Sequence, residues 1–136
     1  MGTIATNRRE NILYYHSGTT LGKQTMAYME ASDNKVLDVD ISKTKVTGTQ
    51  WVEIADGLHL HVSDLVEKEH PNFVKNYGSA PVDLNDEDWI KVLENHPEVV
   101  TYPIVIRGGT FLQIKNPSDF SKFLGSEVDG KYETGN

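Results

Sequence analysis

The stretch that decides the fold is Ile12-Leu13-Tyr14-Tyr15-His16-Ser17-Gly18-Thr19-Thr20-Leu21-Gly22-Lys23-Gln24-Thr25. Its first four residues are apolar at consecutive positions, which is typical of a central strand buried on both faces. A helix should follow, because apolar or small residues then recur at the spacing of one helix face: Leu21, Thr25, Tyr28 and Met29. Thr19 or Thr20 can cap its start. A strand-to-helix turn presents free backbone N–H groups, so we expect a binding site here.

The rest of the chain extends this unit on both sides. Residues 36–41 alternate between apolar and acidic side chains, which predicts a strand at or near a sheet edge. A strand–helix–strand order makes these two strands parallel neighbours. After a mainly helical segment, residues 102–106 form a second apolar run, and Arg107-Gly108-Gly109-Thr110 predicts a hairpin turn into a strand at 111–114. Asn116-Pro117 opens a last helix.

This order predicts an α/β fold of the thioredoxin-like kind: βαβ, a helical insertion, then ββα, with a four-stranded mixed sheet. The 136 residues fit one domain. We place the domain at residues 11–125, with the helical insertion at about 45–97. Residues 1–10 read as a polar lead-in, and residues 126–136 as a flexible tail.

The composition of the chain narrows the classes of partner and chemistry that it could have. The net charge is −7, and the longest basic run is Arg8-Arg9, so a direct nucleic-acid partner is not expected. No apolar run approaches the ~20 residues of a membrane span. Residues 1–10 lack the apolar core of a signal peptide, which predicts a cytoplasmic protein. The chain contains no cysteine, which excludes disulfides, cysteine–metal sites and thiol chemistry by the protein itself. No cofactor is expected.

Two segments carry a resemblance to a known family. The strand, turn and helix around residues 14–29 and the run His96-Pro97-Glu98-Val99-Val100-Thr101-Tyr102-Pro103-Ile104-Val105-Ile106 resemble the arsenate-reductase-like (ArsC/Spx) family, which includes the Spx transcriptional regulators. The glycine pair Gly108-Gly109 and the Pro117 helix follow at family-like spacing. The resemblance runs from about residue 11 to residue 124 and implies a bacterial-type, thioredoxin-like fold.

The same resemblance implies that the catalytic residues are gone. Reductases of this family carry a nucleophilic cysteine at the first turn, which aligns with Thr19. Their three oxyanion-holding arginines align with Tyr102, with a position near Asn116, and with a position near Glu67. A threonine hydroxyl cannot replace a thiolate, which both attacks the substrate and carries the oxidation. Losing the arginines removes the bidentate clamp on a tetrahedral oxyanion. Reductase activity is therefore not expected.

Other chemistry at the first turn remains open. Thr19, Thr20 and Lys23 could hold a small anion, or they could only cap the helix and carry a solvated lysine. His16 could act as a base toward Thr19, but no nearby acid orients it, so a hydrogen-bonding role in the turn is favoured. His59, His61 and His70 fall at a helix junction, so we expect no metal site.

The resemblance further implies a cis Tyr102–Pro103 bond beside the turn. The backbone there could then pair with a peptide or small molecule, or it could serve only the fold. The leading hypothesis is a non-catalytic binding protein, a pseudoenzyme whose groove involves His16, Thr19, Thr20, Lys23, Tyr102, Pro103 and Asn116. Its partner would be a protein or a small ligand. The alternatives are a non-redox enzyme, or a protein that binds a small anion or glutathione in the same groove.

Overall fold

The computed structural model describes residues 11–32, 35–79 and 82–129. The predicted lead-in at 1–10 lies outside these ranges. The elements, in chain order, are β1 (Asn11–Tyr15), α1 (Thr20–Ala31), β2 (Val36–Asp40), α2 (Gly48–Leu58), η1 (Val62–Leu65), α3 (Pro71–Tyr77), α4 (Asp86–Asn95), η2 (Pro97–Val99), β3 (Ile104–Arg107), β4 (Thr110–Gln113) and α5 (Ser118–Asp129). None of the described helices has the length and apolar character that crossing a membrane requires.

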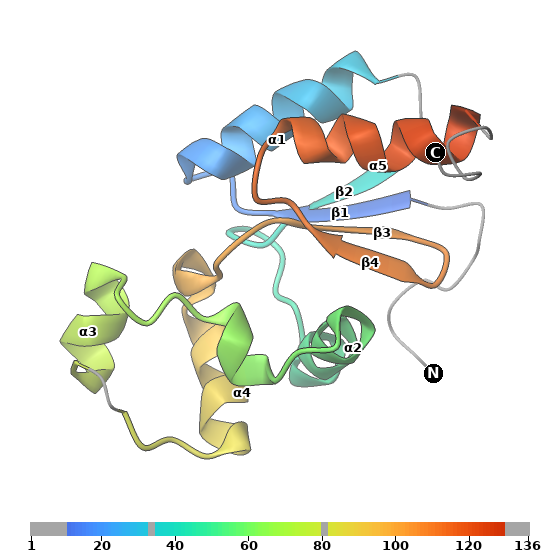
Figure 1. Ribbon diagram of the computed structural model, residues 1–136. Helices are drawn as coiled ribbons and strands as arrows, with labels where there is room; N and C mark the ends of the chain where they lie inside the picture. The colour runs from blue at the N-terminus through green and yellow to red at the C-terminus, as the bar shows by residue number, and fades with distance from the viewer. Residues whose placement is uncertain (1–10, 33–34, 80–81, 130–136) are drawn as a thin grey trace.

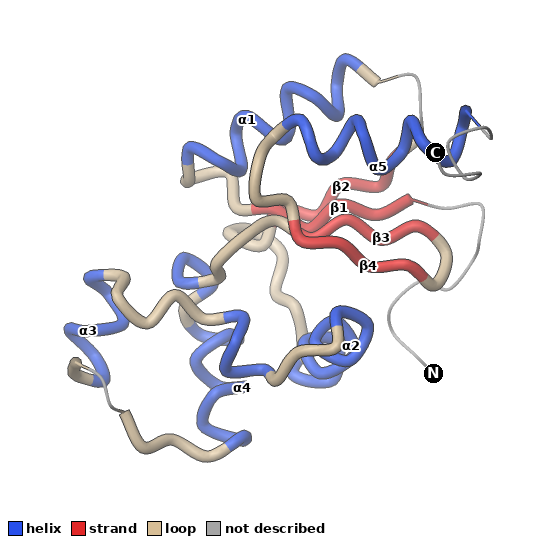
Figure 2. Tube along the Cα trace, in the orientation of Figure 1, coloured by secondary structure: helices blue, strands red, loops and turns tan. Residues whose placement is uncertain are grey.

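The four strands form one mixed sheet in the order β2-β1-β3-β4. β1 pairs in parallel with β2 and antiparallel with β3, and β3 and β4 form the expected hairpin. Helices α1 and α5 cover one face, and the helical insertion lies on the other side (Figures 1 and 2). The predicted α/β class, strand directions and insertion are confirmed. β3 begins only at Ile104, since Pro103 has no N–H to donate to a sheet.

Both faces of β1 are buried, as its apolar run predicted. Leu13 and Tyr15 pack with Val105, Ile114 and Phe120 under α1 and α5. Ile12 and Tyr14 face the insertion, in a larger cluster that includes Trp51, Ile54, Phe73, Trp89 and Leu93. β1 is therefore held between two cores. Two of the insertion helices, α2 and α4, begin with a capping box, formed by Thr47 with Gln50 and by Asn85 with Asp88.

The face of α1 was predicted incorrectly in part. Tyr28 is 40% exposed, and the residues buried in the helix are Gly22 and Thr25. Met26 and Met29 also lie on this face, where they pack against the cluster that contains Leu13 and Phe120. The pattern of apolar residues did not indicate that Gly22 lies on the buried face of α1, because glycine has no apolar side chain. Yet Gly22 is where α1 approaches the sheet most closely: a Cβ built there would lie 2.0 Å from the His16 carbonyl oxygen.

Leu37 is apolar and yet 57% exposed, and it lies on β2, an edge strand of the sheet. One boundary also differs. The last helix runs to Asp129, four residues beyond the expected domain end, because Gly125 is tolerated inside α5 instead of ending it. Residues 130–136 of the expected tail lie outside the described ranges.

Gly22→Ala should destabilise the fold strongly. The new Cβ would meet backbone atoms of His16 and the Thr19 hydroxyl, so α1 would have to move away from β1. We expect a loss of about 2 kcal/mol or more in the free energy of unfolding, measured by urea denaturation. Gly109→Ala is the control, since a Cβ there meets nothing within 4 Å. Equal effects of the two substitutions would contradict the close-approach role of Gly22.

Candidate functional site

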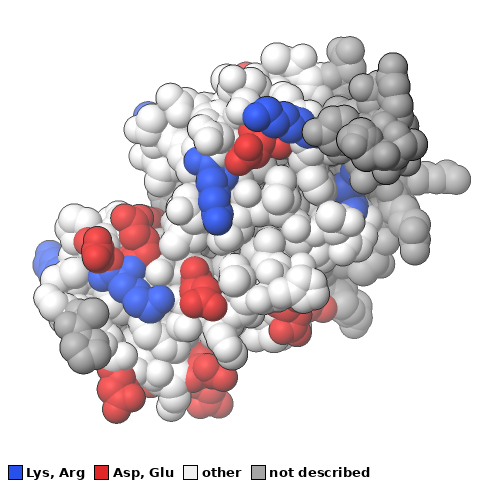
Figure 3. Space-filling model, in the orientation of Figure 1, with Lys and Arg blue, Asp and Glu red and all other residues white. Residues whose placement is uncertain are grey.

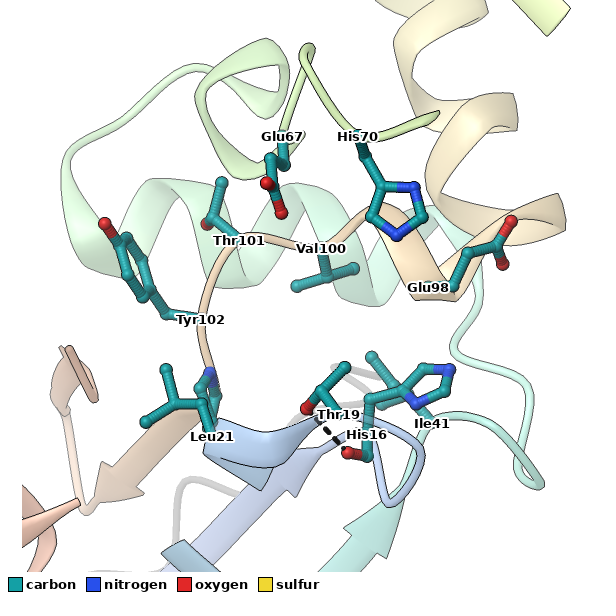
Figure 4. A pocket seen from close by; sticks show the side chains of 11 residues that line it. His16, Thr19, Leu21, Ile41, Glu67, His70, Glu98, Val100, Thr101 and Tyr102 are labelled. Atoms are coloured by element: carbon teal, nitrogen blue, oxygen red, sulfur yellow. Dashed lines mark hydrogen bonds between the residues drawn. The ribbon is translucent and has the colours of Figure 1, made fainter. Parts of the chain in front are cut away.

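A pocket of about 200 Å³ lies between the first turn and the helical insertion (Figure 4). The turn and the start of α1 contribute His16, Thr19 and Leu21. Ile41 follows β2, and residues 100–103 lead into β3. The insertion supplies the opposite wall with Glu67, His70 and Glu98. The pocket is thus made by four chain segments that are far apart in the sequence: residues 16–21, residue 41, residues 67–70 and residues 98–103.

The structure brings together only some of the predicted site residues. His16, Thr19, Tyr102 and Pro103 all line the pocket. Three others do not: Thr20, Lys23 and Asn116. Thr20 and Lys23 are exposed on α1, and Asn116 is exposed before α5, where its N–H donates to Asp119. The predicted groove therefore needs correction, because consecutive helix residues point in different directions and only one side of α1 faces the pocket.

Thr19 is committed to capping α1. Its Oγ1 accepts a hydrogen bond from the Gly22 N–H at 2.9 Å and donates one to the His16 carbonyl oxygen at 3.0 Å. The hydroxyl proton is thus already used by the backbone. Thr19, and not Thr20, is the N-cap that the sequence left undecided.

The His16 imidazole stabilises the turn through Gly18, while the Thr19 hydroxyl bonds to the His16 backbone carbonyl and not to the ring. Its Nδ1 accepts a hydrogen bond from the Gly18 N–H at 3.0 Å, so a neutral ring carries its proton on Nε2. This is the hydrogen-bonding role that the sequence favoured. A base that activates Thr19 would need its ring nitrogen at the hydroxyl instead.

Asp40, at the end of β2, anchors the turn from the side. Its Oδ1 accepts hydrogen bonds from the Ser17 N–H, the Ser42 N–H and the Ser42 hydroxyl, at 3.2, 3.0 and 2.7 Å. Burial raises the pKa of this carboxyl, but the bonds from Ser17 and Ser42 outweigh that effect and lower the pKa to about 2. Asp40 appeared in the sequence only as a solvated position of an edge strand.

Sequence reasoning missed the wall formed by the insertion. The sequence singles out Glu67 only through the family resemblance, and it predicts no metal site at His70. In the structure, the Glu67 and His70 side chains point toward the cavity (Figure 4). His70 Nδ1 accepts the Asn72 N–H at 3.0 Å, while Glu98 contacts Asn72 and His96. Only the family alignment near Glu67 signalled this wall.

The charge of the pocket does not suit an oxyanion. Among its described lining residues are two carboxylates, Glu67 and Glu98, but no lysine or arginine. Burial raises the pKa of Glu98, but hydrogen bonds from its own N–H, Asn72 and His96 outweigh this and lower it. Glu98 is therefore ionised at neutral pH, and a bound oxyanion would meet like charge instead of the donors it requires.

Comparison with known proteins identifies the fold. No protein-family model and no curated protein matches the sequence. Solved structures do match: arsenate reductase from Vibrio cholerae has a TM-score of 0.70 at 16% identity, covering 83% of this chain and 96% of its own. A possible arsenate reductase from Streptococcus mutans (TM-score 0.61, 11% identity) covers 83% and 98%. An arsenate reductase related protein from Brucella melitensis (0.61, 12%) covers 91% and 98%. The chain thus has the arsenate reductase fold.

Thr19→Ala should remove the side-chain N-cap of α1 and leave the rest of the structure unchanged. We expect a loss of about 1 kcal/mol in the free energy of unfolding, because Gly22 N–H loses its acceptor. Thr19→Ser should stay within a few tenths of a kcal/mol of wild type. The control is Thr20→Ala, at the first helical position, which should be nearly neutral in the same denaturation experiment. A larger effect at Thr20 would show that the cap is assigned to the wrong threonine.

Asp40 should make stability depend on pH in the acid range. Its pKa is about 2 in the folded chain against an ordinary 3.8, so its contribution is complete above about pH 5. The contribution is lost as the pH falls from there toward 2. Melting temperatures of wild type and Asp40→Asn should therefore differ most at neutral pH and converge in acid. Ser42→Ala, which removes one hydroxyl donor, should show the same trend more weakly. A difference that is constant with pH would contradict this role.

Proposed function

We propose that this protein is a non-catalytic binding protein with the fold of arsenate reductases, and that it binds a protein partner in the pocket beside the first turn. One observation carries this proposal. The positions where the family resemblance places the catalytic cysteine and one arginine lie in the pocket and hold Thr19 and Tyr102, and Glu67, near which it places another arginine, lines the same pocket. The fold is thus retained, while the residues that would carry out the reductase chemistry are replaced.

The chemistry of these residues argues against redox turnover. Reduction of an oxyanion or a disulfide needs a sulfur that attacks and is then oxidised, and the chain has no cysteine. Thr19 has no comparable oxidation states, and its hydroxyl proton is held by the His16 carbonyl. Glu67 and Tyr102 cannot form the paired donors that arginine gives to an oxyanion. We infer that the redox activity has been lost.

The shape and lining of the pocket favour binding. Four apolar residues line the pocket: Leu21, Ile41, Val100 and Pro103. Tyr102 lines its edge and is half-buried. The segment before β3 is held in place by hydrogen bonds from Thr101 N–H to Leu65 and from Ile114 N–H to Pro103. A fixed concave surface with apolar, aromatic and polar groups is typical of recognition sites.

The alternative functions have less support. A non-redox enzyme would need an activated hydroxyl, but the Nδ1 of the His16 ring is bonded to the Gly18 N–H, and the Thr19 hydroxyl donates to a backbone carbonyl. Small anions and the carboxylates of glutathione would face Glu67 and Glu98, while Lys23 does not line the pocket. A small uncharged or cationic ligand remains compatible with the lining. The cytoplasmic location and the absence of a nucleic-acid partner stay predictions from the sequence.

Affinity capture from native lysate, compared between two tyrosine variants, tests this function. Tyr102→Ala removes an aromatic ring from the pocket edge. Tyr28→Ala is the matched control, because Tyr28 is exposed on α1 and does not line the pocket. A partner retained by wild type and Tyr28→Ala should be lost about tenfold or more with Tyr102→Ala. Capture that is equal in all three proteins would contradict a partner site in this pocket.

A further inference from the structure

The pocket contains a carboxylate that none of the described residues neutralises. The Glu67 side chain points toward the cavity in Figure 4, and it makes no hydrogen bond or ion pair with any described residue. Its backbone, in contrast, is fixed, since its N–H donates to the Val99 carbonyl oxygen at 2.7 Å. A carboxylate held over a concave surface is available for a cation from outside.

The other lining groups strengthen this preference. Glu98 adds a second carboxylate that is ionised at neutral pH. The Nδ1 atoms of His16 and His70 are occupied by backbone N–H donors, and no lysine or arginine is among the described lining residues. Figure 3 shows acidic side chains spread over the helical insertion, without a large basic patch on that face. The pocket therefore favours a positively charged group.

The apolar lining residues specify what kind of cation fits. The pocket lining also includes four apolar residues: Leu21, Ile41, Val100 and Pro103. A small hydrated ion would leave this apolar surface uncovered. Lysine and arginine side chains combine an apolar stem with a charged end, and they bury the stem along apolar surface while the end meets a carboxylate. A volume of about 200 Å³ is enough for one such side chain, not for a folded segment.

We propose that the pocket binds a single lysine or arginine side chain exposed on the protein partner, with Glu67 as its main charge contact. This inference rests on the proposed binding function and names the chemistry of the partner. The apolar lining residues contact the stem of this side chain, and the carboxylates contact its charged end. The site thus binds a basic side chain in preference to an acidic one.

NMR titration of the full-length chain with short blocked peptides tests the proposal. The probes are acetyl-Gly-Arg-Gly-amide, its lysine counterpart and acetyl-Gly-Glu-Gly-amide. The basic peptides should shift backbone resonances of the lining residues, and the shifts should weaken as NaCl rises from about 0.05 to 0.5 M. The acidic peptide should leave them unchanged. No basic-peptide shifts at about 20 mM, or tighter binding of the acidic peptide, would overturn the proposal.

Charge variants identify the contact. Glu67→Gln should weaken the basic peptides about fivefold, and Glu67→Lys should abolish their binding, with unchanged melting temperatures because the side chain is exposed. Glu87→Gln, on an exposed first-turn position of α4, is the matched control and should bind like wild type. An unchanged affinity of Glu67→Gln would overturn the assignment of Glu67.

The two proposals can fail separately. A partner whose capture depends on Tyr102, together with no basic-peptide binding, would refute the basic side chain and leave the binding function intact. Basic-peptide binding at the pocket, without any Tyr102-dependent partner, would refute the protein-binding function and leave the charge preference of the pocket standing.

Discussion

The site depends on the close approach of Gly22, in the first turn of α1, to the carbonyl oxygen of His16 at the end of β1. A Cβ at this position would overlap that oxygen, so a side chain of any size would move α1 away from the sheet. The close approach lets Thr19 contact both the His16 carbonyl and the Gly22 N–H, which fixes the turn. Asp40 then ties the turn to β2 through Ser17 and Ser42. These contacts give the pocket one rigid wall.

The same contacts explain how a scaffold can persist without its chemistry. The wall needs a small residue at Gly22, a capping oxygen at Thr19 and an acceptor at Asp40, and none of these roles requires a thiol. A threonine supplies the cap that the turn needs. On the facing wall, Glu67 is exposed and carries no packing role, so its charge can change without altering the fold. A change of charge at this position can therefore leave the shape of the pocket intact.

The sequence predicted the sheet well because its signals are local and strong. The doubly buried β1, the two-glycine hairpin and the capped insertion helices each follow from a few neighbouring residues. The buried face of α1 was predicted only in part, because the apolar pattern includes Tyr28 and gives no weight to Gly22, whose close approach is to a backbone oxygen across the turn. Thr20 and Lys23 were included because they lie near Thr19 in the sequence, which ignores the direction of their side chains, and Asn116 because the family resemblance places an arginine near it. Glu67, His70 and Glu98 became site residues only through long-range packing of the insertion on the first turn.

The central claim is that the scaffold no longer performs redox chemistry, and arsenate consumption by the purified protein tests it most directly. The assay supplies glutathione as an external thiol at millimolar concentration, so that a missing cysteine could be replaced from solution. The account predicts a rate equal to that of glutathione and arsenate alone, at every protein concentration. A rate that rises in proportion to the protein concentration would contradict it.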